Sequence, residues 1–163
     1  MPFVFASFSS ATTTSSWTHR RLNNAQWTVT SGGSYCALST DDAGNPCVQD
    51  TLGHYGASED CSFTLETGGA TLVRMEWGLE DDSNCAYDYL QLDGGTKYCG
   101  TASSAKVFPA SMAVSRATTF AFHSDGSVFG VGFKICAQPP AGTTWSPTPA
   151  PPTPAPTPPT PAP

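Results

Sequence analysis

Five carboxylates fall within one short stretch of the sequence, GLEDDSNCAYDYLQLDGG at residues 78–95. The second half of this stretch, YDYLQL, has the aromatic and apolar residues that favour a β-strand. Carboxylates gathered on neighbouring turns are typical ligands of a hard metal cation. The alternative is a β-hairpin whose charged side chains face water. The five carboxylates are Glu80, Asp81, Asp82, Asp88 and Asp93.

Residue types that often carry catalysis are present without the arrangement that catalysis needs. His19, His54 and His123 lie apart from any Cys or Ser nucleophile signature, and no Gly-x-Ser-x-Gly, Walker or HExxH motif occurs. His123 is followed by Ser124 and Asp125, an order that fits a cation-binding loop better than a catalytic triad. The sequence therefore predicts that this protein is not an enzyme.

Length and charge limit the possible partners. The 163 residues suffice for one domain with appendages, and the formal net charge is −6. The basic residues are scattered apart from Arg20 and Arg21, so the clustered cations of a nucleic-acid surface are missing. No apolar run approaches the ~20 residues of a membrane span. The N-terminus lacks the basic region and long apolar core of a signal peptide, which suggests a processed or partial secreted chain.

Six cysteines, an even number, predict three disulfides and an oxidising, extracellular location. Zinc is excluded by spacing, because no Cys-x-x-Cys or Cys-x-x-His pair occurs. Charged residues make up only 12% of the chain, which is typical of a secreted β-rich module.

Composition divides the chain into three zones. Residues 1–28 form a Ser/Thr-rich arm with an alternating apolar patch at residues 3–8, which predicts either a strand added to a neighbouring copy or packing on the chain's own domain. Residues 29–138 contain every cysteine and most of the apolar residues, and predict one domain. Residues 139–163 form a proline-rich tail, whose last 18 residues contain ten prolines and therefore exclude both helix and sheet ladder.

The middle zone is expected to consist of β-strands, because short runs with alternation or β-branched and aromatic enrichment are separated by Gly-Gly, Asp-Gly and Asn-Pro. No helical periodicity is found. The fold class is therefore all-β, an antiparallel β-sandwich or jelly roll. The expected strands are 62–65, 71–77, 87–92, 117–122 and 131–135. The expected core comprises Phe63, Leu65, Leu72, Tyr89, Leu90, Phe120, Phe122 and Phe133.

Several motifs in order resemble a CUB domain, the extracellular β-sandwich of complement proteases, developmental proteases and spermadhesins. They are Cys36 and Cys61 spaced by 25 residues, Cys-Ala-Tyr-Asp-Tyr-Leu at 85–90, Cys-Gly at 99–100, Ser-Asp-Gly-Ser at 124–127 and Gly-Phe at 132–133. The resemblance spans roughly residues 33–138 and implies a CUB-like jelly roll.

The resemblance also implies a calcium site, since many CUB domains bind calcium. Glu80 and Asp88 match the first two acidic ligands of that subgroup and Asp125 matches the third. Ser127 matches a ligand that often acts through its main chain, and Tyr55 matches a tyrosine that orients a ligand carboxylate. Three carboxylates from separate loops would supply the charged share of the six to eight oxygens that Ca²⁺ takes. In the alternative reading, Asp88 flanks a strand and Asp125 makes an Asx-turn, while Asp81, Asp82 and Asp93 are expected to be solvated turn residues.

The family spacing implies the pairs Cys36–Cys61 and Cys85–Cys99, which leaves Cys47–Cys136 as an additional pair. The alternative pairs Cys47 with Cys61 and Cys36 with Cys136. Each disulfide would stabilise the fold by roughly 2–4 kcal/mol.

The tail resembles the glycomodules of hydroxyproline-rich cell-wall glycoproteins of plants and green algae, because Ser-Pro, Thr-Pro and Ala-Pro pairs alternate with occasional Pro-Pro. The resemblance implies hydroxylated prolines with O-linked glycans on a stiff polyproline II rod. The candidate glycosylation residues are Ser146, Pro147, Thr148, Pro149, Pro151, Pro152, Thr153, Pro154, Pro156, Thr157, Pro158, Pro159, Thr160, Pro161 and Pro163.

These observations favour a secreted, non-catalytic structural glycoprotein, in which a disulfide-stapled bead and a glycosylated rod form a subunit of an extracellular fibre or matrix. The expected partners are further copies of the chain, other matrix proteins and glycans. The alternative is a calcium-dependent extracellular module that binds proteins or carbohydrates in adhesion.

Overall fold

Ten β-strands and no helix make up the described part of the chain in the computed structural model, which describes residues 26–51, 53–66, 69–115 and 117–145. The strands are β1 (Gln26–Ser31), β2 (Cys36–Thr40), β3 (Pro46–Asp50), β4 (Asp60–Glu66), β5 (Ala70–Gly78), β6 (Tyr89–Leu92), β7 (Lys97–Tyr98), β8 (Ser111–Val114), β9 (Thr118–His123) and β10 (Gly132–Gln138). Within these residues, no helix is long and apolar enough to cross a membrane. Residues 1–25 of the predicted arm (1–28) and residues 146–163 of the predicted tail (139–163) lie outside the described residues, and what was predicted for them stays a prediction.

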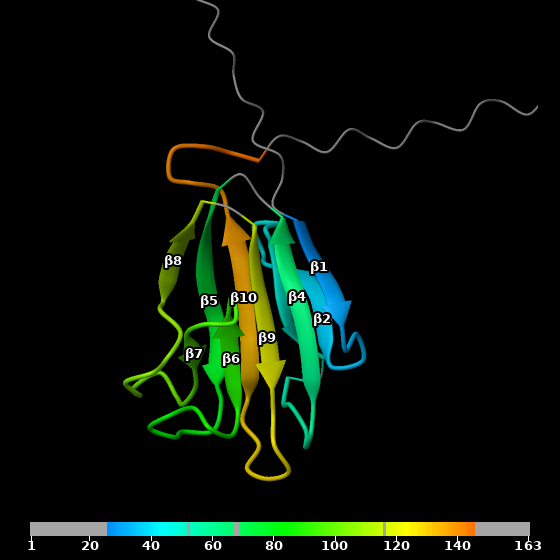
Figure 1. The fold of residues 1–163 in the computed structure, drawn as a ribbon. Coiled ribbons are helices and arrows are strands. Elements are labelled where there is room, and N and C mark those ends of the chain that lie inside the picture. The colour runs from blue at the N-terminus through cyan, green and yellow to red at the C-terminus, as the bar shows by residue number, and fades with distance from the viewer. Residues whose placement is uncertain (1–25, 52, 67–68, 116, 146–163) are drawn as a thin grey trace, which may run out of the picture.

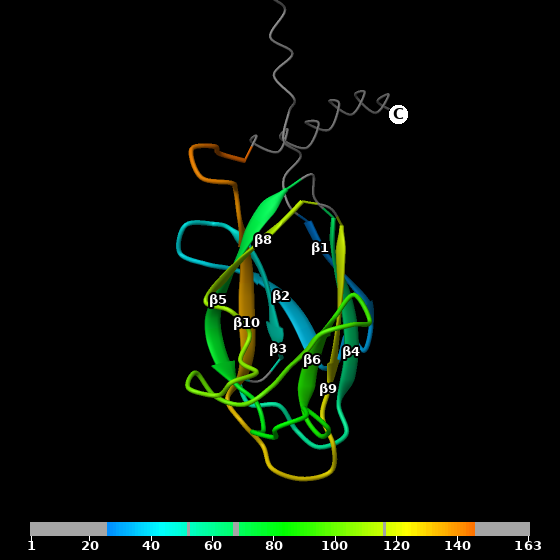
Figure 2. The same ribbon diagram turned by 60° about the vertical axis from the view of Figure 1, so that its left-hand side comes forward.

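The strands form two five-stranded sheets that pack face to face (Figures 1 and 2). One sheet has the order β1-β4-β9-β6-β7 and the other has the order β2-β3-β10-β5-β8. Every pair of neighbouring strands is antiparallel. The prediction of an all-β antiparallel sandwich is therefore confirmed.

Alternating apolar residues of both sheets fill the space between them. In β4 the side chains of Cys61, Phe63 and Leu65 are buried while the residues between them are more exposed, as expected for a strand with one face on the core. The ring of Phe63 stacks on Phe120 with centroids 5.3 Å apart and on Phe133 with centroids 5.8 Å apart. Phenylalanines from both sheets thus form the centre of the core.

Seven of the eight predicted core residues are buried, and Tyr89 is the exception. Since its neighbour Leu90 faces the core, strand geometry turns Tyr89 to the outer face. There the tyrosine ring lies between Lys97, whose Nζ is 3.4 Å from the ring centroid, and the ring of His123. The expected strand at 87–92 is correspondingly shorter, because β6 begins at Tyr89.

The sandwich also begins earlier than the sequence predicted. The expected boundary at residue 29 falls inside β1, because Trp27 is buried against Phe63 and Phe120. The indole Nε1 of Trp27 donates a hydrogen bond of 3.1 Å to the carbonyl of Pro46 in the opposite sheet. Trp27 therefore belongs to the core.

The described cysteines form three disulfides, Cys36–Cys61, Cys47–Cys136 and Cys85–Cys99. These are the pairs that the CUB resemblance implied, and the alternative pairing of Cys47 with Cys61 is not the one in the structure. Cys36–Cys61 and Cys47–Cys136 are buried in the sandwich, while Cys85–Cys99 ties the β5–β6 connection to the segment after β7. Three disulfides are typical of a domain that works in an oxidising, extracellular environment.

Candidate metal centre

Three carboxylates from two connections, two from the β5–β6 connection and one from the β9–β10 connection, meet at one end of the sandwich. Glu80 follows β5, Asp88 precedes β6 and Asp125 follows β9, and one carboxylate oxygen from each lies within 4.8 Å of the others. The β9–β10 loop that carries Asp125 forms the lower end of the molecule in Figure 1. Because β6 and β9 are neighbours in one sheet, the strand topology brings Asp125 to the two carboxylates of the β5–β6 connection.

Backbone hydrogen bonds hold two of these side chains in place. Asp88 Oδ1 accepts 2.8 Å from the backbone amide of Asp125, and Asp125 Oδ1 accepts 2.8 Å from the backbone amide of Ser127. The hydroxyl of Ser127 donates to the same Asp125 oxygen at 3.3 Å. The amide of Ser58 donates 2.6 Å to the Asp125 carbonyl, so the loop is also fixed from the other side.

Two carboxylate oxygens of the cluster have no such partner. Asp88 is almost completely buried, and its Oδ2 has no hydrogen-bond partner among the described residues. Glu80 Oε2 is likewise buried and unpartnered. Buried charged oxygens are costly unless a donor or a cation satisfies them. The arrangement therefore leaves oxygens available to a cation.

The pKa of Glu80 reflects its burial and an excess of negative charge around its carboxylate. Burial, first, and then the neighbouring carboxylates of Asp88, Asp125 and Asp82 raise the pKa of Glu80 above its ordinary value. Each of these causes disfavours the ionised form of the side chain. A divalent cation at this place would reverse the balance by favouring the ionised carboxylates.

Tyr55 lies directly beside the cluster and is buried. Its hydroxyl accepts a hydrogen bond of 3.0 Å from the backbone amide of Glu80 and donates a long one of 3.5 Å to the carbonyl of Val128. Burial, and then the adjacent Asp88 carboxylate, raise the pKa of Tyr55. The sequence predicted that Tyr55 orients a ligand carboxylate, and a side-chain hydrogen bond with Asp88 is the second cause that raises its pKa. Tyr55 also contacts Glu80, through the backbone amide of that residue.

Two of the other acidic residues of the 78–95 stretch, Asp82 and Asp93, accept backbone hydrogen bonds in and beside turns. Asp82 Oδ2 accepts hydrogen bonds from the amides of Asn84 and Ala86 at 3.0 and 2.9 Å, and the bond from Ala86 is the largest cause that lowers the pKa of Asp82. Asp93 Oδ1 accepts 2.8 Å from the amide of Thr119. These contacts explain why so many aspartates surround the cluster without joining it.

Beside the acidic cluster lies an apolar pocket that the sequence did not predict. It has a volume of about 420 Å³, and Trp77, Leu79 and Phe129 are among its lining residues together with Glu80 and Asp81. Trp77 and Phe129 are 52 positions apart in the sequence, and no local motif connects them. A usable signal was the run Val-Phe-Gly-Val at 128–131, which is unusually apolar for a loop.

No family model matches the sequence. The chain is similar to two solved structures, the CUB1-EGF-CUB2 domains of human MASP-1/3 and of rat MASP-1, each 17% identical with a TM-score of 0.45. Each match covers 71% of this chain, and 42% of the human and 40% of the rat chain. This chain therefore corresponds to less than half of the length of either structure.

Proposed function

We propose that this protein is a CUB-like extracellular module that binds calcium between the β5–β6 and β9–β10 connections and acts as a non-catalytic structural subunit. The observation that carries the proposal is the meeting of Glu80, Asp88 and Asp125, with two buried oxygens left unpartnered. Oxygen ligands from several loops are what Ca²⁺ prefers.

The carboxylates of Glu80, Asp88 and Asp125 would hold the ion, and Ser127 would assist through its main chain. A bound calcium ion supplies positive charge that neutralises the repulsion among the carboxylates. Because the ligands come from separate connections, binding would also fasten those connections together. Tyr55 keeps Glu80 in position through the backbone amide.

The structural role is supported by the disulfides and by the composition of the flanking sequence. Three disulfides stabilise a small domain, and the segment 146–163 has the composition of a glycosylated, hydroxyproline-rich rod. A bead with such a rod suits a repeating subunit of an extracellular fibre or cell-wall matrix. Mass spectrometry of the native tail peptide tests this part, because finding unmodified proline and no O-glycan would contradict the rod.

A second candidate is calcium-dependent adhesion to a protein or carbohydrate partner. The specific observation in its favour is the exposed Phe129, which lies on the same loop as Asp125, four residues further on. Large exposed apolar side chains next to a polar site are common at interaction surfaces.

The calcium site is tested by isothermal titration with CaCl₂ and by thermal unfolding with and without a chelator. At about 100 times its dissociation constant, calcium should stabilise the fold by roughly 2.7 kcal/mol. Asp88→Asn keeps the side-chain acceptor for Asp125 but removes the charge, so it should abolish the gain. Asp42→Asn is the matched control, because Asp42 is an exposed carboxylate outside the cluster. An unfolding temperature of the wild-type chain that calcium does not change would refute the site.

A further inference from the structure

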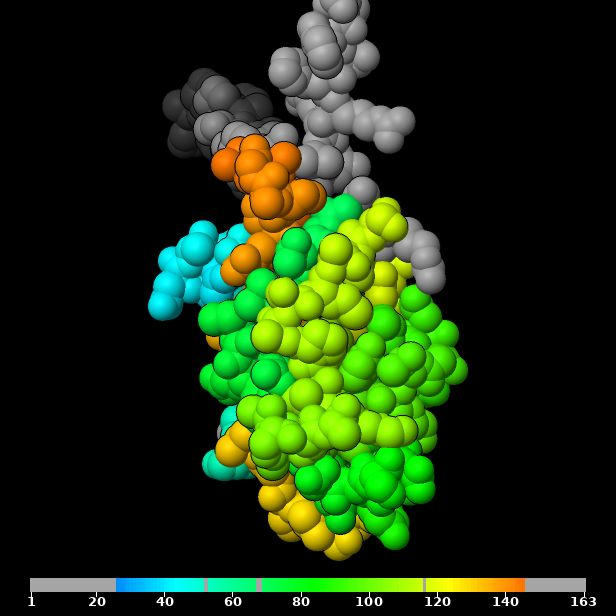
Figure 3. Space-filling view, turned by 90° about the vertical axis from the view of Figure 1, so that its left-hand side faces the viewer, coloured from blue at the N-terminus to red at the C-terminus, as the bar shows by residue number. Residues whose placement is uncertain are grey.

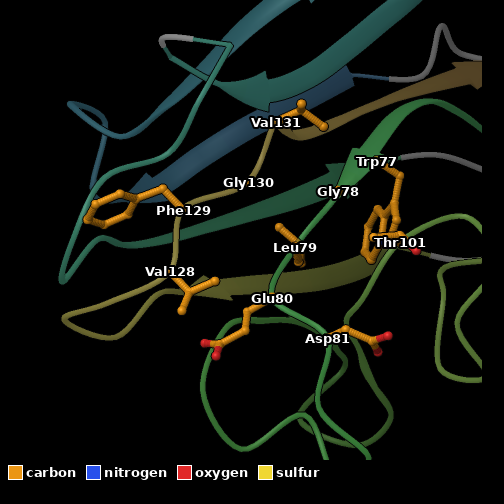
Figure 4. Close-up of a pocket in the computed structure, with 10 residues that line it drawn as sticks. All are labelled: Trp77, Gly78, Leu79, Glu80, Asp81, Thr101, Val128, Phe129, Gly130 and Val131. Atoms are coloured by element: carbon orange, nitrogen blue, oxygen red, sulfur yellow. The ribbon is translucent and has the colours of Figure 1, made fainter.

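The apolar pocket next to the acidic cluster has the form of a binding groove. Figure 4 shows Phe129 and Trp77 on opposite sides of its lining, with Leu79 between them and the carboxylates of Glu80 and Asp81 along one edge. Its volume of about 420 Å³ lies within the usual range for a ligand site. The groove could therefore accept extended, mostly apolar groups that lie across two aromatic side chains.

The loop that forms one wall exposes its apolar side chains to an unusual degree. Val128, Phe129 and Val131 are 56%, 59% and 48% exposed. Val128 also has a φ of +54°, which is strained for a β-branched residue. Strained, exposed apolar loops are characteristic of functional surfaces.

This wall is fixed before any ligand arrives. Gly130 packs directly on Gly78, since a Cβ built on Gly130 would lie 2.0 Å from the Gly78 carbonyl oxygen. The carbonyls of Val128 and Gly130 are within hydrogen-bonding distance of the Tyr55 hydroxyl and of His54 Nδ1, at 3.5 and 3.3 Å. A preorganised groove loses little entropy on binding.

Trp77 adds a second aromatic side chain to the lining. Its ring stacks on Phe108, and its buried Nε1 has no acceptor among the described residues. A ligand with flat apolar rings suits such an aromatic wall. Polyproline II segments have this chemistry, and aromatic-lined grooves are their usual binding sites.

We propose that the groove binds the proline-rich segment 146–163 of a second copy of this chain. Ten of its 18 residues are prolines, so 18 carbonyls accompany only eight backbone N–H groups. The segment has no charged side chain, and therefore the carboxylates of Glu80 and Asp81 do not repel it. Its preformed conformation reduces the entropic cost of docking.

The position of the groove favours a second copy over the chain's own tail. Residues 139–145 lie at one end of the sandwich and the β9–β10 loop at the other (Figure 3). Strand β10 alone separates them by about 23 Å. To dock on its own domain, the segment would have to reverse direction beyond Trp145, which a stiff polyproline II chain resists.

A contact of this kind joins unlike surfaces, so it builds open chains of subunits wherever the segments are not exchanged reciprocally between two copies. With a reach of about 56 Å, the segment can extend from one sandwich to the groove of the next. The inference deepens the proposed structural function, on which it rests for its biological meaning, but it does not require calcium. Docking requires prolines without attached glycans. Some of the prolines in residues 146–163 of the native protein are therefore expected to be unglycosylated.

The experiment uses the full 163-residue chain produced in a host that does not hydroxylate proline. Sedimentation velocity across a wide concentration range should show growing assemblies. A free peptide of residues 146–163 should return them to monomers, whereas the same peptide with every proline replaced by alanine should not. Phe129→Ser should weaken assembly by about tenfold or more. Leu38→Ser is the matched control, because Leu38 is similarly exposed (53%) but does not line the groove.

Calcium titration of the same samples separates the two proposals. Phe129→Ser should bind calcium like the wild type, since it changes no carboxylate. Peptide-sensitive assembly without calcium binding would remove the calcium site and leave the docking. A chain that stays monomeric at all concentrations, or assemblies indifferent both to the peptide and to Phe129→Ser, would overturn the docking.

Discussion

The hydroxyl of Tyr55 accepts a hydrogen bond of 3.0 Å from the backbone amide of Glu80, 25 residues further along the chain. The same hydroxyl reaches the carbonyl of Val128 at 3.5 Å. One phenol oxygen thus links the start of the acidic cluster to the wall of the groove. Because the ring also packs edge-on against Phe122, the contact is anchored in the core.

Replacing this hydroxyl is therefore expected to affect stability and calcium affinity together. Tyr55→Phe leaves the Glu80 amide without its acceptor and should destabilise the fold by about 1 kcal/mol, measured by urea unfolding. Calcium affinity, measured by titration, should fall because Glu80 is less well positioned. Tyr87→Phe is the control, since Tyr87 is half exposed and its ring does not belong to the core. Equal behaviour of the two variants would contradict the linking role.

Asp50 predicts a pH dependence of stability. Its carboxylate is almost completely buried, and burial is the largest cause that raises its pKa, opposed by a hydrogen bond of 3.1 Å from the amide of Phe133. A carboxyl group whose pKa is higher in the folded state makes the fold most stable below its unfolded pKa. That stability is lost as pH rises through the folded pKa.

Asp50→Asn removes this titration and keeps an acceptor for Phe133. The variant should be more stable than the wild type by about 1 kcal/mol at neutral pH, with the difference vanishing near pH ~4. Urea unfolding at both pH values measures the effect, and Asp42→Asn serves as an exposed control. A difference that stays constant with pH would show that Asp50 is not the responsible group.

Gly132 is predicted to be intolerant of any side chain. Its φ is +84°, and a Cβ would lie 2.2 Å from Asp50 Oδ1. Gly132→Ala should therefore destabilise the fold by roughly 2 kcal/mol or more, from backbone strain and steric conflict together. Gly44→Ala isolates the strain, because Gly44 has a φ of +79° with nothing within 4 Å of the added Cβ. Equal losses of unfolding free energy in the two variants would exclude the conflict with Asp50.

The disulfides should contribute to stability in the order of the loops that they close. Cys47–Cys136 joins residues 89 apart in sequence and Cys85–Cys99 joins residues 14 apart. Replacing both cysteines by alanine should cost about 4.5 kcal/mol for the first pair and about 3 kcal/mol for the second, by loop-closure entropy. Denaturant unfolding of the two double variants measures the order, and a larger loss for the short loop would contradict it.

Four of the strands that sequence patterns predicted carry a core face that is visible in their own sequence. β4, β5, β9 and β10 each carry alternating or continuous apolar residues, so the patterns at 62–65, 71–77, 117–122 and 131–135 were sufficient. β7 has only two residues, and β2 is an edge strand that exposes Leu38. Both strands form by pairing with a neighbouring strand and have no distinctive pattern of their own. Pairing of this kind leaves no local signal.

The acidic cluster was likewise only partly predictable from sequence patterns. No local pattern relates Asp88 to Asp125, and the family resemblance, not the spacing, suggested that they lie together. The structure adds the hydrogen bond of 2.8 Å that the backbone amide of Asp125 donates to the Asp88 carboxylate. The groove was missed because its aromatic side chains come from β5 and from a loop that fold into contact only through the sandwich topology.

The disulfide between Cys47 and Cys136 has a mechanical consequence for a subunit that is pulled through its flanking segments. β1 begins and β10 ends at the same end of the sandwich (Figure 1), and the shortest covalent path between them crosses this disulfide. Tension applied to the two flanks therefore runs from residue 26 to Cys47, across the sulfur atoms, and out from Cys136. Residues 48 to 135, which include the acidic cluster and the groove, form a closed covalent loop. Pulling on the two flanks therefore cannot extend this part of the chain, even where the strand pairing of β1 with β4 gives way.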